Sequence, residues 1–186
     1  GTPDSAEGWR MKALAAGLNG NERAALAAFA SGRNAAGDKG RLYAAEASFH
    51  LSRGRGDAAR EAVGLAQTAA PRAIETLFIT ARLAQLDGKA EIAARAYSAI
   101  LQIAPLDRPA LLGAIYEMGN IDRVDLVRPL VARGRGAYPG DVEFVFLEAR
   151  VMAQVCSPPE ARACAWLMIH ASAAPSGYGC GTRSTR

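Results

Sequence analysis

The sequence has few aromatic residues, few cysteines and few histidines. Of its 186 residues, 6% are Phe, Trp or Tyr, with 3 Cys and 2 His. The cores of β-sheets favour aromatic and β-branched side chains, so this composition argues against a β-sandwich or a β-barrel. Alanine, the strongest helix former, instead makes up about a fifth of the chain. We therefore expect an all-α protein.

Long apolar runs and dense basic runs are also absent. No segment approaches the ~18 consecutive apolar residues of a membrane span. We therefore expect no membrane span. The formal net charge is +4, but the arginines are dispersed among Gly and Ala, so we also expect no nucleic-acid partner. The chain starts at Gly1 without an initiating Met, which is typical of a trimmed or processed chain. The sequence therefore leaves a cytoplasmic and a periplasmic location open.

The sequence contains no motif that supports catalysis or cofactor binding. It has no Walker loop, dinucleotide fingerprint or HExxH motif, and its acidic residues are scattered singly. Structural zinc ligands usually pair at spacings of two to four residues, whereas Cys156, Cys164, His170 and Cys180 are separated by gaps of seven, five and nine. His50 falls at a packing position and is expected to be a satisfied interior or partly buried side chain, not a catalytic one. We predict a non-enzymatic protein with no cofactor and no metal.

The strongest signal is an internal repeat. Pro71, Pro105 and Pro139 follow one another at intervals of 34 residues. Before each proline lie a helical stretch that starts with a bulky residue, a turn and a second helix. In 74–107 the first stripe is Leu77, Ala81 and Ala84, the turn is Gly88, and the second stripe is Ala93, Tyr97 and Ile100. Such a period predicts stacked helix hairpins, each of which buries its apolar face against its neighbours.

These positions resemble the tetratricopeptide repeat (TPR) family. Its pattern has a large fourth residue, a small eighth, small residues near the twentieth and twenty-seventh, and a proline at the thirty-second. The resemblance implies a right-handed superhelical solenoid of antiparallel helix hairpins with about four and a half repeats. We expect a leader at 1–5, a solenoid at 6–174 and a flexible tail at 175–186. The repeats are 6–39, 40–73, 74–107, 108–141 and a degenerate 142–174.

Several positions depart from the TPR pattern. Lys12, Glu46 and Thr80 stand where the family usually has an apolar seventh residue. Asp122 replaces the turn glycine of the fourth repeat, and Pro129 lies within its second helix. Because an internal proline removes a backbone hydrogen bond, we expect a kink in that helix.

The resemblance also implies where a partner binds, because the first helices of TPR hairpins line a concave groove. We expect apolar anchors of a protein or peptide partner there, with an acidic group for Arg82 or Arg150. The alternative is that some of these side chains pack against their own neighbours. The two-carboxylate clamp of TPR co-chaperones is not matched. The expected groove residues are Arg10, Met11, Leu14, Arg41, Phe78, Ile79, Arg82, Gln85, Leu112, Tyr116, Asn120, Phe146 and Arg150, with Leu18, Ser48, Leu51 and Leu147 beside them.

Three functions remain open from the sequence. The first is a scaffold that holds a partner protein in its groove, in bacterial envelope assembly, secretion or pilus biogenesis. The second is the recognition or docking domain of a larger enzyme such as a transferase. The third is a self-associating solenoid. The segment 163–169 is apolar all round, so it needs a cover from the tail, from a second copy in a homodimer, or from a further domain.

Overall fold

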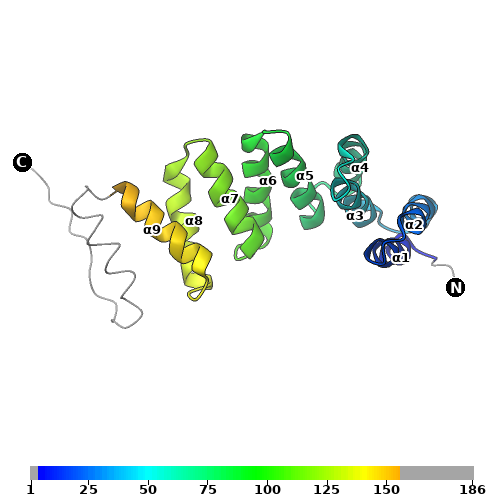
Figure 1. Ribbon diagram of the computed structural model, residues 1–186, viewed down its shortest axis with the longest axis horizontal. Coiled ribbons are helices and arrows are strands. Elements are labelled where there is room, and N and C mark those ends of the chain that lie inside the picture. The colour runs from blue at the N-terminus through cyan, green and yellow to red at the C-terminus, as the bar shows by residue number, and fades with distance from the viewer. Residues whose placement is uncertain (1–3, 156–186) are drawn as a thin grey trace, which may run out of the picture. The chain divides into compact units, whose positions relative to one another are not determined.

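The computed structural model describes residues 4–155, and the regular secondary structure of this range is helical (Figure 1). Ser5, just before the first helix, and Ala36, just after the second, form an isolated parallel β-bridge. The helices are α1 (Ala6–Leu18), α2 (Glu22–Asn34), α3 (Gly40–Leu51), α4 (Gly56–Ala69), α5 (Ile74–Leu86), α6 (Ala90–Ile103), α7 (Arg108–Asn120), α8 (Val124–Ala137) and α9 (Val142–Val155).

The chain forms two compact units, Gly1–Gly134 and Arg135–Arg186. The first unit contains α1 to α7 and most of α8. In the second unit the described residues comprise the last turn of α8 and α9. The ring of Tyr138 stacks on that of Phe144, with centroids 5.8 Å apart, and Arg135 Nε donates to Glu148 Oε2 at 2.7 Å. These contacts hold the start of α9 against the end of α8.

In the first unit the helices pack as hairpins, as the repeat predicts. α1 packs on α2, α3 on α4 and α5 on α6, and α3 also touches the first helices on either side of it, α1 and α5. The predicted small residues Ala13, Ala47 and Ala81 are fully buried, and the absence of a larger side chain at each lets the helices approach closely.

The second helices supply the other half of each hairpin core. Phe29, Val63 and Tyr97, which are spaced by 34 residues, are all buried. A methyl group at Gly32 would stand 2.8 Å from Cδ1 of Leu42, so this position has room for no side chain. The buried stripes confirm the 34-residue register that the sequence predicts.

The turns between paired helices share one backbone conformation. Gly20, Gly54 and Gly88 have φ angles of 72°, 69° and 68°, the left-handed region that glycine enters without steric cost. Asp122 has a φ of 55° and thus adopts the same conformation in the fourth turn. Asp122 therefore preserves the backbone shape of this turn, but at a steric cost that a glycine would not have.

The other departures from the TPR pattern have local explanations. α8 continues through Pro129, so this proline does not end the helix. Glu46 is buried but is held by Arg33, whose Nη2 donates to Glu46 Oε1 at 2.7 Å. Thr80 donates its hydroxyl to the carbonyl of Thr76 at 2.8 Å. Lys12 is exposed, with its ammonium over the ring of Trp9. Each polar group is thus partnered or solvated.

His50 is buried as predicted, but it is not satisfied. Its Nδ1 has no hydrogen-bond partner among the described residues, and its Nε2 lies 4.0 Å from Glu46 Oε1. Burial lowers the pKa of His50 below its ordinary 6.5, and the nearby Glu46 carboxylate only partly opposes this shift. The interior of the second hairpin therefore favours the neutral imidazole.

Several sequence expectations fall outside residues 4–155. They concern Cys156, Cys164, His170 and Cys180, the apolar segment 163–169 with its homodimer contact, and the tail from residue 175. For these the sequence-based expectations stand untested.

Candidate binding surface

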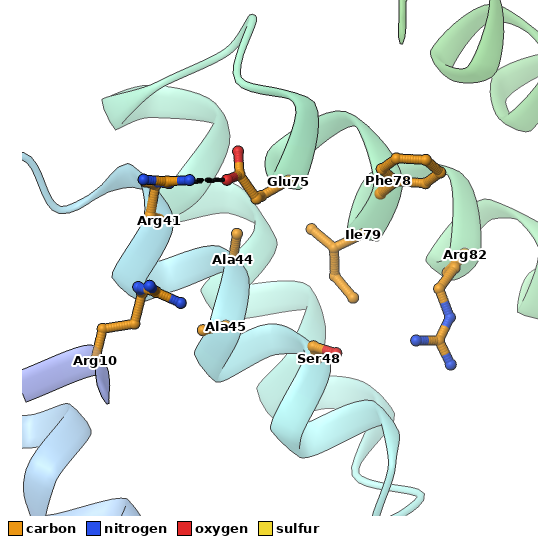
Figure 2. A pocket seen from close by; sticks show the side chains of 9 residues that line it. All are labelled: Arg10, Arg41, Ala44, Ala45, Ser48, Glu75, Phe78, Ile79 and Arg82. Carbon is orange, nitrogen blue, oxygen red and sulfur yellow. Dashed lines mark hydrogen bonds and ion pairs between the residues drawn. The ribbon is translucent and has the colours of Figure 1, made fainter. Parts of the chain in front are cut away.

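A hollow of ≈ 250 Å³ lies across α1, α3 and α5, where the sequence predicts the groove (Figure 2). We call it the Arg82 pocket. It is lined by Arg10, Arg41, Ala44, Ala45, Ser48, Glu75, Phe78, Ile79 and Arg82.

The floor of the Arg82 pocket is apolar because α3 contributes small side chains. Ala44 and Ala45 leave space that larger residues would fill, and Figure 2 shows them between Arg10 on one side and Ile79 on the other. Phe78 is half-buried, and its ring meets that of Tyr97 edge-on at a centroid distance of 6.1 Å. The aromatic wall is therefore fixed by a core residue of the same hairpin.

Two of the three arginines in the Arg82 pocket are ion-paired. Arg41 Nη2 lies 2.7 Å from Glu75 Oε1, one repeat further along the chain, and Arg10 Nε donates to Glu7 Oε2 at 2.7 Å. The hydrogen bond from Arg10 lowers the pKa of Glu7. Burial opposes ionisation of Glu75, but its own backbone N–H and Arg41 outweigh burial and lower its pKa. Both carboxylates are therefore ionised at neutral pH and neutralise these two arginines.

Arg82 differs from the other two arginines. Its side chain is exposed, and it forms no ion pair with any group in the described part of the chain. Figure 2 shows it on α5, one turn beyond Phe78 and away from the Arg41–Glu75 pair. The pocket thus combines an apolar floor with one uncompensated positive charge.

Beside the Arg82 pocket lies a polar cluster that the sequence did not predict as a unit. Glu117 is buried, and its two oxygens accept from Gln85 Nε2 at 2.8 Å and Asn120 Nδ2 at 3.3 Å. The Tyr97 hydroxyl donates to Gln85 Oε1 at 3.1 Å. Burial, followed by the charge of Glu117, raises the pKa of Tyr97. Gln85 and Asn120 are therefore exposed, as expected of groove residues, but each also donates a hydrogen bond to the buried Glu117.

The remaining predicted residues divide between surface and core. Met11 and Tyr116 are exposed, and Leu14 is half-buried. Ile79 and Leu112 are buried, so they support the surface more than they form it. Phe146 and Arg150 belong to α9 in the second unit. There Phe146 is exposed, with the Arg150 guanidinium 5.8 Å from its ring centroid.

Sequence reasoning missed two acidic residues that matter here. Glu75 faces Arg41 because equivalent positions of neighbouring repeats lie side by side, so the opposite charges 34 residues apart were a usable signal. Glu117 gave no such signal, since its partners are neutral amides on α5 and α7.

A second hollow, of ≈ 270 Å³, lies where α4, α5 and α6 meet. Its rim is closed by interactions between neighbouring hairpins. Asp87 accepts from Arg60 Nη2 at 2.6 Å and from Lys89 Nζ at 3.2 Å, and Gln67 donates to Thr80 at 3.1 Å. The hydrogen bond from Arg60 is the first cause of a lowered pKa at Asp87. These polar groups therefore satisfy one another without a ligand.

Neither a metal site nor a membrane span is found in the range 4–155. No group of three His, Cys, Asp or Glu side chains in this range is placed to hold a metal ion. No helix of this range is long and apolar enough to cross a membrane.

Comparison with solved structures identifies the fold. The chain superimposes on MamA of AMB-1 with a TM-score of 0.69 at 13% identity, covering 92% of this chain and 93% of that one. MamA of MSR-1 gives a TM-score of 0.66 at 16% identity, covering 90% and 98%. The APC/C hetero-tetramer Cut9–Hcn1 gives 0.65 at 12% identity, covering 90% of this chain and 33% of that one.

No family model matches the sequence, and no curated protein matches it either. At such low identity the structural likeness establishes the fold alone. It is the all-α solenoid of TPR-type hairpins that the repeat predicts.

Proposed function

We propose that the chain is a non-enzymatic scaffold that binds a segment of a partner protein along α1, α3 and α5. The segment places an apolar side chain against Phe78 and the alanines of the Arg82 pocket. An adjacent carboxylate of the same segment pairs with Arg82. The observation that carries this proposal is the unpaired guanidinium of Arg82 beside an apolar floor.

The charges of the pocket favour an acidic partner over a basic one. Glu7 and Glu75 neutralise Arg10 and Arg41, so Arg82 leaves a net positive charge on this surface. An incoming carboxylate gains a charge-assisted hydrogen bond from Arg82, whereas an incoming lysine meets a like charge. The exposed side chain of Met11, next to Arg10 on α1, extends the apolar surface.

The bacterial envelope, secretion or pilus setting that the family resemblance implies remains part of this proposal. The docking domain of a larger enzyme and the self-associating solenoid are the competing functions. The three differ in the identity of the bound protein, so one experiment separates them.

The test is site-specific photo-crosslinking in the native host, with benzoylphenylalanine at Ser48 in the pocket wall. The matched control carries the crosslinker at Ala27, an exposed position on α2 outside the pocket. We expect a protein captured from Ser48 and not from Ala27. Arg82→Glu should reduce that capture about tenfold, a loss of about 1.4 kcal/mol, while Arg23→Glu on α2 leaves it unchanged.

The identity of the captured protein decides among the functions. A distinct protein that is lost with Arg82→Glu supports the scaffold. Capture of the chain itself identifies self-association, and capture of a protein that is a substrate of a catalytic domain in the same polypeptide identifies a docking domain. Equal capture from Ser48 and Ala27, or capture that is insensitive to Arg82→Glu, rules out recognition through this pocket.

A further inference from the structure

A third hollow, of ≈ 340 Å³, lies where α6, α7 and the start of α8 meet. We call it the outer notch. Ala94, Met118, Ile121 and Leu126 supply apolar side chains, and Arg95 and Arg123 stand at its rim together with Glu91. The outer notch shares no lining residue with the Arg82 pocket, so its role does not depend on the function proposed above.

The outer notch is the counterpart, one repeat later, of the polar hollow at α4, α5 and α6. In that earlier hollow Asp87 joins Arg60 of one hairpin to Lys89 of the next. The residues 34 positions later are, in the same order, Ile121, Ala94 and Arg123. Both members of the pair between hairpins are therefore replaced by apolar residues, and the cation equivalent to Lys89 is retained.

The junction between the first two hairpins also has ion pairs across it, since Glu22 of α2 pairs with Arg53 and Arg55. Across the outer notch the described residues form no such pair. The guanidinium of Arg123 instead binds Asp125, two residues away and largely exposed, at 2.9 Å. An exposed pair of this kind contributes little and exchanges readily.

We propose that the outer notch is a docking surface for a protein segment that carries an aliphatic side chain next to a carboxylate. The aliphatic side chain covers Met118 and Ile121. The carboxylate takes the position beside Arg123 that Asp87 has beside Lys89 in the preceding repeat. The partner thus supplies the carboxylate that Asp87 of the chain itself supplies at the earlier junction.

Charge selects this occupant over a basic one. The lining of the outer notch contains two arginines and one glutamate, and Arg95 has no ion pair within residues 4–155. A carboxylate therefore meets Arg95, and it competes with the exposed Asp125 for Arg123. A lysine would find only Glu91 and would approach Arg95 and Arg123 at a cost.

The test is methyl NMR on the full chain, with ¹³C-labelled methyl groups of Met, Ile and Leu. The probes are two ten-residue Gly/Ser peptides, one centred on Glu-Leu-Glu and the other on Lys-Leu-Lys. We expect about 1 mM Glu-Leu-Glu peptide to shift the methyl signals of Met118 and Ile121, and the Lys-Leu-Lys peptide to cause at least tenfold smaller shifts.

Three variants make the result decisive. Ile121→Asp restores the missing acid beside Arg123 and should abolish the response of Met118. Ile103→Asp places the same change at an exposed position of α6 outside the notch and should leave the response intact. Arg95→Glu should reverse the preference toward the Lys-Leu-Lys peptide, and it serves as the readout if Ile121→Asp does not fold.

Three results would overturn the proposal. These are no shift of Met118 with 1 mM Glu-Leu-Glu peptide, equal shifts with both peptides, and a response that folded Ile121→Asp retains. Equal shifts would indicate an apolar surface without selectivity for charge.

Discussion

The ring of Tyr97 lies against Gly113 so closely that a β-carbon on the glycine would stand 2.5 Å from Cζ of the ring. This contact joins α6 to α7 and so fixes one hairpin on the next. The same side chain donates its hydroxyl to Gln85 of α5 and packs edge-on against Phe78 of the Arg82 pocket. One core residue therefore links the stacking of hairpins to the shape of the binding surface.

We predict that Gly113→Ala destabilises the chain by about 1–3 kcal/mol, because the added methyl group overpacks the contact with Tyr97. Urea unfolding followed by circular dichroism measures the change. The matched control is Gly64→Ala in the middle of α4, where nothing lies within 4 Å of the added carbon. That change should stabilise by about 0.5–1 kcal/mol. Equal effects of the two variants would contradict the tight contact.

The positive φ of Asp122 gives a second prediction. Asp122→Gly should stabilise the chain by about 1 kcal/mol, because glycine lacks the β-carbon that makes this conformation costly. The reverse change, Gly88→Asp at the equivalent turn, should destabilise by a similar amount. Thermal unfolding of both variants tests the pair, and a lower melting temperature for Asp122→Gly would show that its side chain has a stabilising role.

The Arg33–Glu46 pair predicts strong coupling between two substitutions. Arg33→Met leaves the buried Glu46 carboxylate without its cation and should cost about 1–3 kcal/mol. The double variant Arg33→Met/Glu46→Leu should recover to within about 1 kcal/mol of the original, since an apolar pair replaces a partly buried ion pair at little cost. A double-mutant cycle from urea unfolding measures the coupling. Additive losses would mean that the two side chains act separately.

His50 predicts a pH dependence of stability. Burial lowers its pKa in the folded chain, so below about pH 6.5 the unfolded chain takes up a proton that the folded chain resists. Stability should therefore fall as the pH decreases from 6.5 toward the lowered pKa and then level off. His50→Leu should remove this slope from urea midpoints between pH 7.5 and 5.5.

The control for His50 is His170→Gln, at the chain's other histidine. The part of the slope that this variant retains between pH 7.5 and 5.5 is the part that His170 does not cause. A His50→Leu variant with the original slope would show that a different group titrates in this range.

Much of the fold follows from the sequence because its determinants recur. Ala13, Ala47 and Ala81 must be small, and a small residue every 34 positions is visible without a structure. The shape of the fourth turn was harder to predict. Asp122 departs from the turn glycine, yet it adopts the left-handed conformation because the flanking helices require it.

The candidate site was less predictable than the fold. The TPR resemblance placed Arg10, Arg41 and Arg82 on one surface, and the Arg82 pocket contains all three. Whether an arginine is ion-paired depends on whether an acidic side chain lies close enough to it. Arg41 pairs with Glu75, whereas Arg82 has no acidic partner among the described residues. Repeat position alone does not contain that information.

The hairpin contacts have a mechanical consequence. In the first unit, helices in substantial contact are sequence neighbours or first helices of successive hairpins, so no strong contact ties the first hairpin to the third. Under a stretching force such an array should lengthen one hairpin at a time. Each released repeat of 34 residues adds on the order of 110–120 Å of extension. The first unit would thus unfold in regular steps, one hairpin at a time.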